Sequence, residues 1–187
     1  MFANKRRQII LCQNQLFWDP NWIPNHQIHY SRRNSIFYSL FAAKNNHADV
    51  VELFVSYNRN LLIIKNISGD TPLHVACTYN SGKTLKRLIQ LGASIEMKNE
   101  SFWTPLILAA KNNAKDCVKI LLQNQVIVDA IDKEDNSQNA LIYAANHGHH
   151  EIVKLLIENG ADVSMNDSSY MNALCYAIME DKRLNIF

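Results

Sequence analysis

Apolar residues recur at helical spacing in several short segments of the chain, and polar stretches separate these segments. One segment carries Val118, Leu121 and Leu122 among charged residues, and a second carries Ile152 and Leu156 in the same arrangement. Spacings of three and four residues place such side chains on one face of an α-helix. The pattern therefore predicts short amphipathic helices, each with one buried face and one charged face.

A helix of a different kind is predicted upstream of each amphipathic helix. Thr71 and Thr104 can cap a helix through their hydroxyl groups, and each is followed by a proline in the first turn, where proline loses no hydrogen bond. Asn139 and Asn172 are equally good caps. Behind the caps lie small residues, such as the alanines at 109–110, which allow neighbouring helices to pack closely.

The helix pairs repeat along the chain. The capping positions 71, 104, 139 and 172 are 33, 35 and 33 residues apart, and a further line from Phe37 matches from Ala42 onward, 34 residues before Ala76. With T-P-L-H-V-A from Thr71, the sequence resembles the ankyrin-repeat family, whose unit of about 33 residues is a β-turn finger and two antiparallel helices opened by T-P-L-H-x-A. The resemblance implies an all-α ankyrin-repeat solenoid of stacked helix-turn-helix units with short β-hairpin fingers.

The register of the repeats divides the chain into two parts. Residues 1–33 form an N-terminal capping segment, which is either a degenerate half repeat or an irregular arm. The half repeat is suggested by "LCQNQLFWD" at 11–19, which matches "LLQNQVIVD" at 121–129. A solenoid needs such ends, because its terminal units have an apolar face with no neighbour. Residues 34–187 form the ankyrin-repeat domain, with repeats at about 34–68, 69–101, 102–136 and 137–169 and a partial C-terminal repeat at 170–187. The partial repeat either caps the array or is followed by more of a longer chain.

The end of each second helix favours glycine. Gly92 and Gly160 stand where a residue with left-handed backbone ends a helix at low cost, and Gln125 and Asn58 stand there in the other repeats. A left-handed residue other than glycine costs about 1 kcal/mol. We therefore expect the repeats of Gln125 and Asn58 to be weaker or to end differently.

The resemblance implies that the finger turn also has glycine, two residues before the helix cap. Gly69 fits this pattern, but Phe102 and Tyr170 replace it in later fingers. Aromatic residues at a finger tip favour either a binding hot spot or packing between neighbouring fingers. Under the first interpretation, Trp103→Ala weakens partner binding and leaves the fold intact, because a finger tip is remote from the helical core.

Composition and charge exclude several functional classes. A chain of 187 residues with 48% hydrophobic and 19% charged residues indicates one globular domain, and a net charge of +2 does not predict a nucleic-acid surface. Four cysteines without a CxxC pair argue against zinc and redox motifs and favour a reduced, intracellular compartment. The N-terminal apolar run is too short for a signal peptide or a membrane span. We expect a cytoplasmic protein without membrane insertion that is monomeric on its own.

Two short motifs suggest chemistry but fit the repeat better. The segment "SGKT" at 81–84 lacks the first glycine of a phosphate-binding loop, because Cys77 stands at that position. The resemblance implies hydrogen-bonding roles for His74 and for His149 in "HGHH" at 147–150. No nucleophile elbow and no pocket with convergent polar groups is indicated. We predict that the protein is not an enzyme and has no catalytic residue, cofactor or metal.

The resemblance implies a non-catalytic protein–protein interaction module, an adaptor or scaffold, that binds a protein partner through its finger tips and the concave surface of its inner helices. One alternative is a regulatory or targeting domain of a larger protein. Another, suggested by the Asn-, Ile- and Lys-rich composition, is an ankyrin-type effector of an intracellular bacterium that acts in the host cytosol. The expected partner-binding residues are Asp70, Thr78, Tyr79, Glu100, Ser101, Phe102, Trp103, Lys111, Asn112, Gln138, Asn146, His147, Ser169, Tyr170 and Met171.

Overall fold

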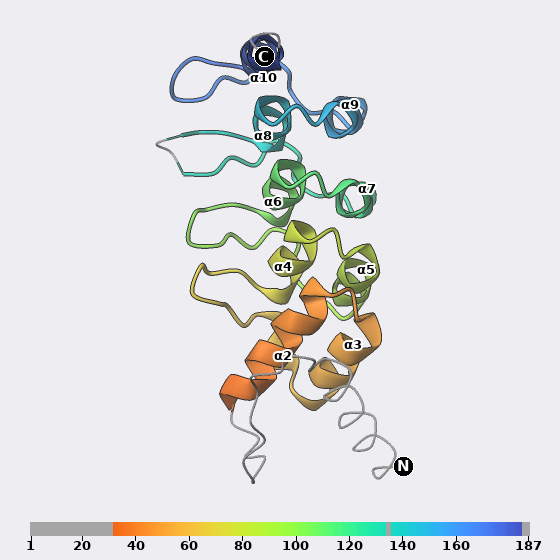
Figure 1. The fold of residues 1–187 in the computed structure, drawn as a ribbon. Helices are drawn as coiled ribbons and strands as arrows, with labels where there is room; N and C mark the ends of the chain where they lie inside the picture. Colours follow the sequence, from red (N-terminus) through yellow and green to blue (C-terminus); the bar gives the residue numbers. More distant parts are fainter. Residues whose placement is uncertain (1–31, 134–135, 185–187) are drawn as a thin grey trace.

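A computed structural model describes residues 32–133 and 136–184 of the chain (Figure 1). The expected N-terminal capping segment lies almost entirely outside the described residues. Within them the protein is an all-α solenoid, as the repeat predicts, and no segment is a β-strand. None of the helices within these ranges has the length and apolarity that crossing a bilayer requires.

The helices form two columns, with turn-rich fingers projecting beside one of them (Figure 1). The column beside the fingers contains the inner helices, and neighbouring inner helices pack on one another. They are α2 (Arg32–Lys44), α4 (Pro72–Thr78), α6 (Pro105–Lys111), α8 (Ala140–Asn146) and α10 (Ala173–Leu184). The second column contains the outer helices. They are α3 (Ala48–Tyr57), α5 (Gly82–Gln90), α7 (Lys115–Gln123) and α9 (His150–Glu158), with the 3-10 helix η1 (Arg59–Leu62) after α3.

The inner helices begin at the capping residues that the sequence predicts. The side-chain oxygen of Thr104 accepts a hydrogen bond from the Ile107 N–H at 3.3 Å, and that of Asn139 accepts one from Ile142 N–H at 2.9 Å. Such caps satisfy main-chain donors that have no partner within the helix. The caps recur at the period of the repeat, so α4, α6, α8 and α10 start in the same register, whereas α2 starts earlier in its unit, at Arg32.

The turns between inner and outer helices provide caps of a second kind, which the sequence analysis does not anticipate. Asn46 and Asn80 adopt left-handed backbone, with φ of 59° and 51°. The Asn46 Oδ1 accepts the main-chain N–H of Thr84 at 3.0 Å. The Asn80 Oδ1 accepts the N–H groups of Asp116 and Cys117, at 3.2 and 3.3 Å. Each asparagine therefore caps the outer helix of the following repeat and joins adjacent units.

The ends of the outer helices agree with the expectation from glycine positions. Gly92 and Gly160 have φ of 94° and 88°, and Gln125 adopts the same left-handed region with φ of 58°. Asn58 is extended instead, with φ of −149°, and its side chain accepts the Asn60 N–H at 3.1 Å at the start of η1. The repeat of Asn58 thus ends differently, whereas the repeat of Gln125 keeps the turn with a strained residue.

One hydrophobic core runs along the stack between the two columns of helices. Leu73, Leu106 and Leu141 occupy equivalent positions on successive inner helices, and each is only 1% exposed. Leu174 is the equivalent residue on α10, but it is 67% exposed, and Ile178 one turn later is also exposed. The α10 helix therefore presents to solvent an apolar position that a neighbouring repeat covers elsewhere in the stack.

Candidate partner-binding surface

Apart from residues 134–135, four fingers lie within the described part of the chain, and each closes around one Asn or Asp. In the second finger, the Asn99 N–H donates to the Trp103 carbonyl at 3.1 Å, and the Asn99 Oδ1 accepts the Trp103 N–H at 3.0 Å. Asn66, Asp132 and Asp167 make the same pair of bonds in the other fingers. The first to fourth fingers are residues 64–70, 94–103, 127–138 and 162–171.

We call the residue two before each helix cap the tip position. It adopts left-handed backbone in all four fingers, with φ of 76° at Gly69, 60° at Phe102, 53° at Ser137 and 58° at Tyr170. The sequence prediction of a turn that favours glycine is therefore confirmed. Left-handed backbone costs roughly 1–2 kcal/mol for residues with a Cβ atom, so Phe102 and Tyr170 are held in strained positions.

Glycine is required at the tip of the first finger because the second finger lies against it. A Cβ atom on Gly69 would lie 2.6 Å from the Glu100 nitrogen, which donates to the Ser68 carbonyl at 3.1 Å. Within the described residues no equivalent bond joins Ser101 to the third finger, which is two residues longer than the second.

The rings of Phe102 and Tyr170 are exposed, by 50% and 88%. Lys98 and Lys133 flank the Phe102 ring, with their Nζ atoms 6.0 and 5.9 Å from its centroid. No other aromatic ring of the described residues stacks on Phe102. Two cations and solvent surround this ring, rather than a ring of the next finger.

Trp103 points toward the inner helices, although it is adjacent to Phe102 in the chain. Its Nε1–H donates to the Tyr143 hydroxyl at 3.0 Å, and the two rings meet edge to face with centroids 5.9 Å apart. The indole is partly buried and packs against the hydrophobic core. The expectation that this position is remote from the helical core is therefore wrong. The fold places the end of the second finger directly against α8.

The Tyr143 hydroxyl links Trp103 to Asp132 in a chain of hydrogen bonds, which we call the relay. It donates to the Asp132 carboxylate at 2.8 Å, and burial, together with this bond, raises the pKa of Tyr143. The next repeat has the same arrangement: Gln138 Nε2–H donates to the Tyr176 hydroxyl at 3.0 Å, which donates to Asp167 at 2.6 Å. Sequence analysis did not select the two tyrosines or the two aspartates. The recurrence of tyrosine 33 residues apart is the signal that points to them.

Lys111, at the end of α6, lies over the aromatic rings of the relay. Its Nζ is 3.8 Å from the centroid of Trp103 and 5.5 Å from that of Tyr143. Desolvation lowers the pKa of Lys111, while the charge of Asp132 opposes this shift. Lys44, the equivalent residue at the end of α2, lies 4.7 Å from the Tyr79 ring centroid. In two repeats, therefore, the lysine at the C-terminal end of the inner helix lies over an aromatic ring.

The other expected residues of the inner helices lie at the C-terminal ends of α4, α6 and α8, in line with Lys111. Tyr79, Asn112 and His147 are exposed, and Thr78 and Asn146 are half-buried. The Asn112 side chain donates to the Leu108 carbonyl at 2.8 Å, and His147 Nδ1 lies 2.9 Å from the Tyr143 carbonyl oxygen. The His147 ring also lies beside the Tyr143 ring. Trp103, Lys111 and His147 are thus brought together around Tyr143.

Some of the remaining expected finger residues are held in internal hydrogen bonds, and others are exposed to solvent. Asp70 accepts the side-chain amide of Asn99 at 2.7 Å and so joins the first and second fingers. Gln138 is held by Tyr176, and the main-chain N–H groups of Ser169 and Met171 donate to the Asp167 carboxylate. Glu100 and Ser169 are exposed, and Ser101 and Met171 are half-buried. The fourth finger, with Tyr170, lies two repeats away from the second.

The two histidines expected to have structural roles make the expected contacts. His74 Nδ1 lies 2.8 Å from the Thr71 hydroxyl, and its Nε2 lies 3.3 Å from the Trp103 carbonyl oxygen. Desolvation lowers the pKa of His74, against the opposing charge of Asp70. His149 Nε2 lies 3.1 Å from the Lys111 carbonyl oxygen. Both side chains join one repeat to its neighbour.

Comparison with known proteins agrees with the architecture. The family described as "Ankyrin repeats (3 copies)" matches residues 25–99, 80–167 and 127–187. An ankyrin repeat protein of Fowlpox virus is 27% identical over 130 residues, which are 70% of this chain and 89% of the viral protein. The human SMC5-SMC6 complex localization factor protein 1 is 37% identical over 99 residues, 52% of this chain and 9% of that protein.

The nuclear factor NF-kappa-B p105 subunit of rat is 27% identical over 140 residues, 70% of this chain and 14% of that protein. The chain therefore spans most of the viral relative and a small part of the two mammalian ones. From the repeat, the fold and these matches, the chain belongs to the ankyrin-repeat family, whose members are generally non-catalytic protein–protein interaction modules.

Proposed function

We propose that the chain is a protein-binding module, acting as an adaptor or scaffold, and that its partner lies across the fingers and the C-terminal ends of the inner helices. The observation that carries this proposal is Phe102. It is half exposed, no aromatic ring of the described residues stacks on it, and its backbone is in a region that favours glycine. Strain of this kind persists where the surrounding structure or a function maintains it. An exposed aromatic anchor is a common centre of binding energy.

Within this surface the expected residues have different roles. Phe102 and Tyr170 supply exposed rings, and Tyr79, Asn112 and His147 supply the exposed floor of the inner helices. In this proposal the side chains held in internal bonds, Asp70, Trp103 and Gln138, position their neighbours as well as contacting the partner. Trp103 supports Lys111 from below, and Lys111 presents its ammonium group at the surface.

The three cysteines among the described residues are unbridged, which supports a reducing compartment, for which we propose the cytoplasm. Cys77 and Cys117 are buried thiols, and Cys175 is half-buried and free. Free thiols are typical of proteins in reducing compartments.

Capture of the partner tests the proposal most simply. The full chain, immobilised, should retain a partner from lysate of its native cell, which mass spectrometry then identifies. Phe102→Ala should weaken binding of that partner by about tenfold or more. Tyr57→Ala is a matched control, because Tyr57 is 53% exposed and lies at the end of the outer helix α3. A partner that loses affinity with Tyr57→Ala and not with Phe102→Ala contradicts the proposed surface.

A regulatory or targeting domain within a larger protein is the second candidate function. Two observations favour it: Leu174 on α10 is exposed where its equivalents are buried, and the matched segments form 9% and 14% of the human and rat relatives. Sequencing the transcript from the native cell tests this candidate. A reading frame that continues past Phe187 into further repeats or another domain supports it, and a stop codon at that point contradicts it.

A further inference from the structure

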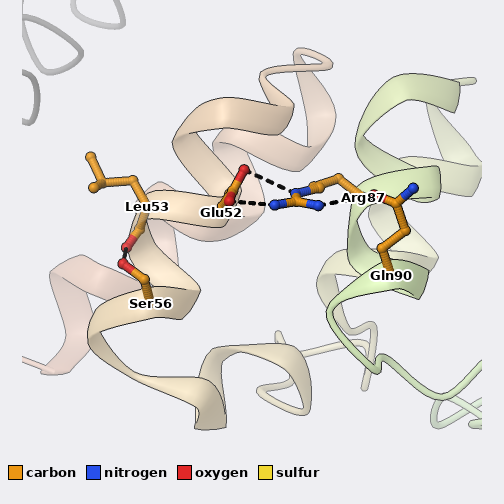
Figure 2. A network of polar contacts seen from close by, with 5 residues as sticks. All are labelled: Glu52, Leu53, Ser56, Arg87 and Gln90. Carbon is orange, nitrogen blue, oxygen red and sulfur yellow. Dashed lines mark hydrogen bonds and ion pairs between the residues drawn. The ribbon is translucent and has the colours of Figure 1, made fainter.

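The charged side chains of the solenoid are paired differently on its two sides. Arg87 of α5 forms an ion pair with Glu52 of α3, as Figure 2 shows, and Lys115 of α7 pairs with Glu151 of α9. A third pair lies along α9 itself. The ion pairs within the described ranges are all on outer helices. On this side of the molecule, the charges of Arg87, Lys115 and Lys154 are each balanced by a carboxylate. The outer-helix lysines Lys83, Lys86 and Lys119 form no ion pair within the described residues.

The lysines on the fingers and the inner helices have no such balance. Across residues 37–133 and 136–181, none of them forms an ion pair with a carboxylate. Lys98 Nζ donates instead to the Ile131 carbonyl at 2.8 Å, and Lys111 lies over rings. We call this set the concave lysines. They are Lys44, Lys65, Lys98, Lys111 and Lys133.

Most carboxylates near the concave lysines are occupied by internal hydrogen bonds. Asp70 accepts from Asn99, and Asp132 and Asp167 are buried and accept from the tyrosine hydroxyls. These carboxylates shape the fingers. Among the described finger residues, Glu100 is an exposed carboxylate. The third finger also contains Glu134 and Asp135, outside the described residues, so Lys133 is left out of the argument below.

We propose that the partner binds through an acidic protein segment, with Asp or Glu side chains that contact Lys44, Lys98 and Lys111 and an apolar or aromatic side chain beside Phe102. This inference rests on the proposed function, since it uses the same surface. Partners of protein interfaces present complementary potentials, and such complementarity raises association rates and specificity. The Phe102 ring, beside Lys98, provides an apolar contact within a positive field.

A protein segment fits this surface better than a nucleic acid does. The positive charges come from single lysines on separate repeats, and the exposed Glu100 lies among them. A phosphate backbone carries a charge at every nucleotide and would meet Glu100 unfavourably, whereas a peptide can leave that place uncharged. The net charge of only +2 points the same way.

A peptide selection tests the inference with the full chain. A displayed library of random twelve-residue peptides is selected against the parent chain, and affinities of enriched peptides are then measured by fluorescence anisotropy. The test variant carries Lys44→Glu, Lys98→Glu and Lys111→Glu. The matched control carries the same charge change on exposed lysines of the outer helices, as Lys83→Glu, Lys86→Glu and Lys119→Glu.

Peptides enriched on the parent chain should be rich in Asp and Glu and contain an apolar residue. They should lose affinity by about tenfold or more with the test variant and by less than about threefold with the control. High salt should weaken their binding to the parent chain, because exposed charges are screened. A variant with glutamine at the same three positions, checked by circular dichroism, separates lost charge from lost folding, since Lys111 contacts Trp103.

Three results would overturn the inference. In the first, the enriched peptides have no acidic bias, bind the parent chain and the test variant equally, and lose affinity with Phe102→Ala. This result would contradict the acidic partner and would still support the proposed function. In the second, the peptides keep their affinity for the test variant and for Phe102→Ala but lose affinity for the outer-helix control. This result would contradict both the acidic partner and the proposed function. A single-stranded oligonucleotide that displaces the peptides at equal or lower concentration would identify nucleic acid as the ligand.

Discussion

Replacing Trp103 with alanine is expected to lower the free energy of unfolding by roughly 3 kcal/mol. The change removes the buried part of the indole, about 1–2 kcal/mol for a partly exposed aromatic ring. It also removes a hydrogen bond to Tyr143, about 1 kcal/mol, and an edge-to-face contact worth about 0.5–1.5 kcal/mol. Lys111 loses the ring beneath its ammonium group, which adds to the loss.

Urea unfolding followed by far-ultraviolet circular dichroism measures this loss. Trp103→Phe keeps one aromatic ring but removes the donor and part of the buried apolar surface, so we expect a smaller cost, of about 1–2 kcal/mol. Combining it with Tyr143→Phe completes a double-mutant cycle. The double variant should be more stable than the sum of the two single changes predicts, by about 1 kcal/mol, because the two groups share one bond.

If the free energy of unfolding of Trp103→Ala lies within about 0.5 kcal/mol of that of the parent chain, which is the typical range for surface substitutions, then Trp103 does not support α8. The original expectation of a finger tip independent of the fold would then be correct. The Gln138 and Tyr176 pair, which repeats the arrangement one unit later, provides a second cycle with the same expected sign.

Three further predictions concern the tip position and a buried histidine. Gly69→Ala should destabilise the fold by more than about 2 kcal/mol, because its Cβ meets the Glu100 nitrogen at 2.6 Å. Gly160→Ala, with open space around it, should cost only about 1 kcal/mol in urea unfolding; equal costs would contradict the packing of the fingers. Phe102→Gly should leave stability unchanged or raise it by up to about 1 kcal/mol while weakening partner binding, and a loss of stability without a loss of affinity would show that the ring is structural. Desolvation lowers the pKa of His74 below that of the unfolded chain, about 6.5. Above this pH both states are neutral, and below it the unfolded chain binds the proton first, so stability should fall by up to about 1.4 kcal/mol per pH unit until the folded pKa is reached. Thermal melts of His74→Gln should lack this part of the pH dependence, and identical profiles for the two proteins would contradict it.

The repeat and its caps were predictable because they are local. A threonine or asparagine that caps its own helix is visible within a few residues of sequence, and the period of about 33 residues sets the stacking. The left-handed tip position was predictable from the resemblance to the ankyrin-repeat family, because Gly69 stands where that family's finger turn has glycine. These features depend on the backbone of a single unit.

The contacts between units were not predictable in the same way. Trp103 meets Tyr143 across forty positions of the chain, and the distance in space depends on the turn of each finger and on the two-residue insertion in the third one. Asn80 caps α7 rather than its own helix. The contrast between paired outer charges and concave lysines also depends on knowing which side chains face each other. The sequence predicts which residues lie on the fingers and at the ends of the inner helices, but it does not divide them into supporting and exposed residues.

Hydrogen–deuterium exchange of the full chain, with and without the captured partner, tests the central claim most directly. The account predicts slower exchange in residues 94–103 and 127–138 and at the C-terminal ends of α4, α6 and α8, because the partner covers the fingers and the inner helices. The outer helices α5, α7 and α9 should exchange as in the free protein. Protection confined to these outer helices, with unchanged exchange in the fingers, would contradict it.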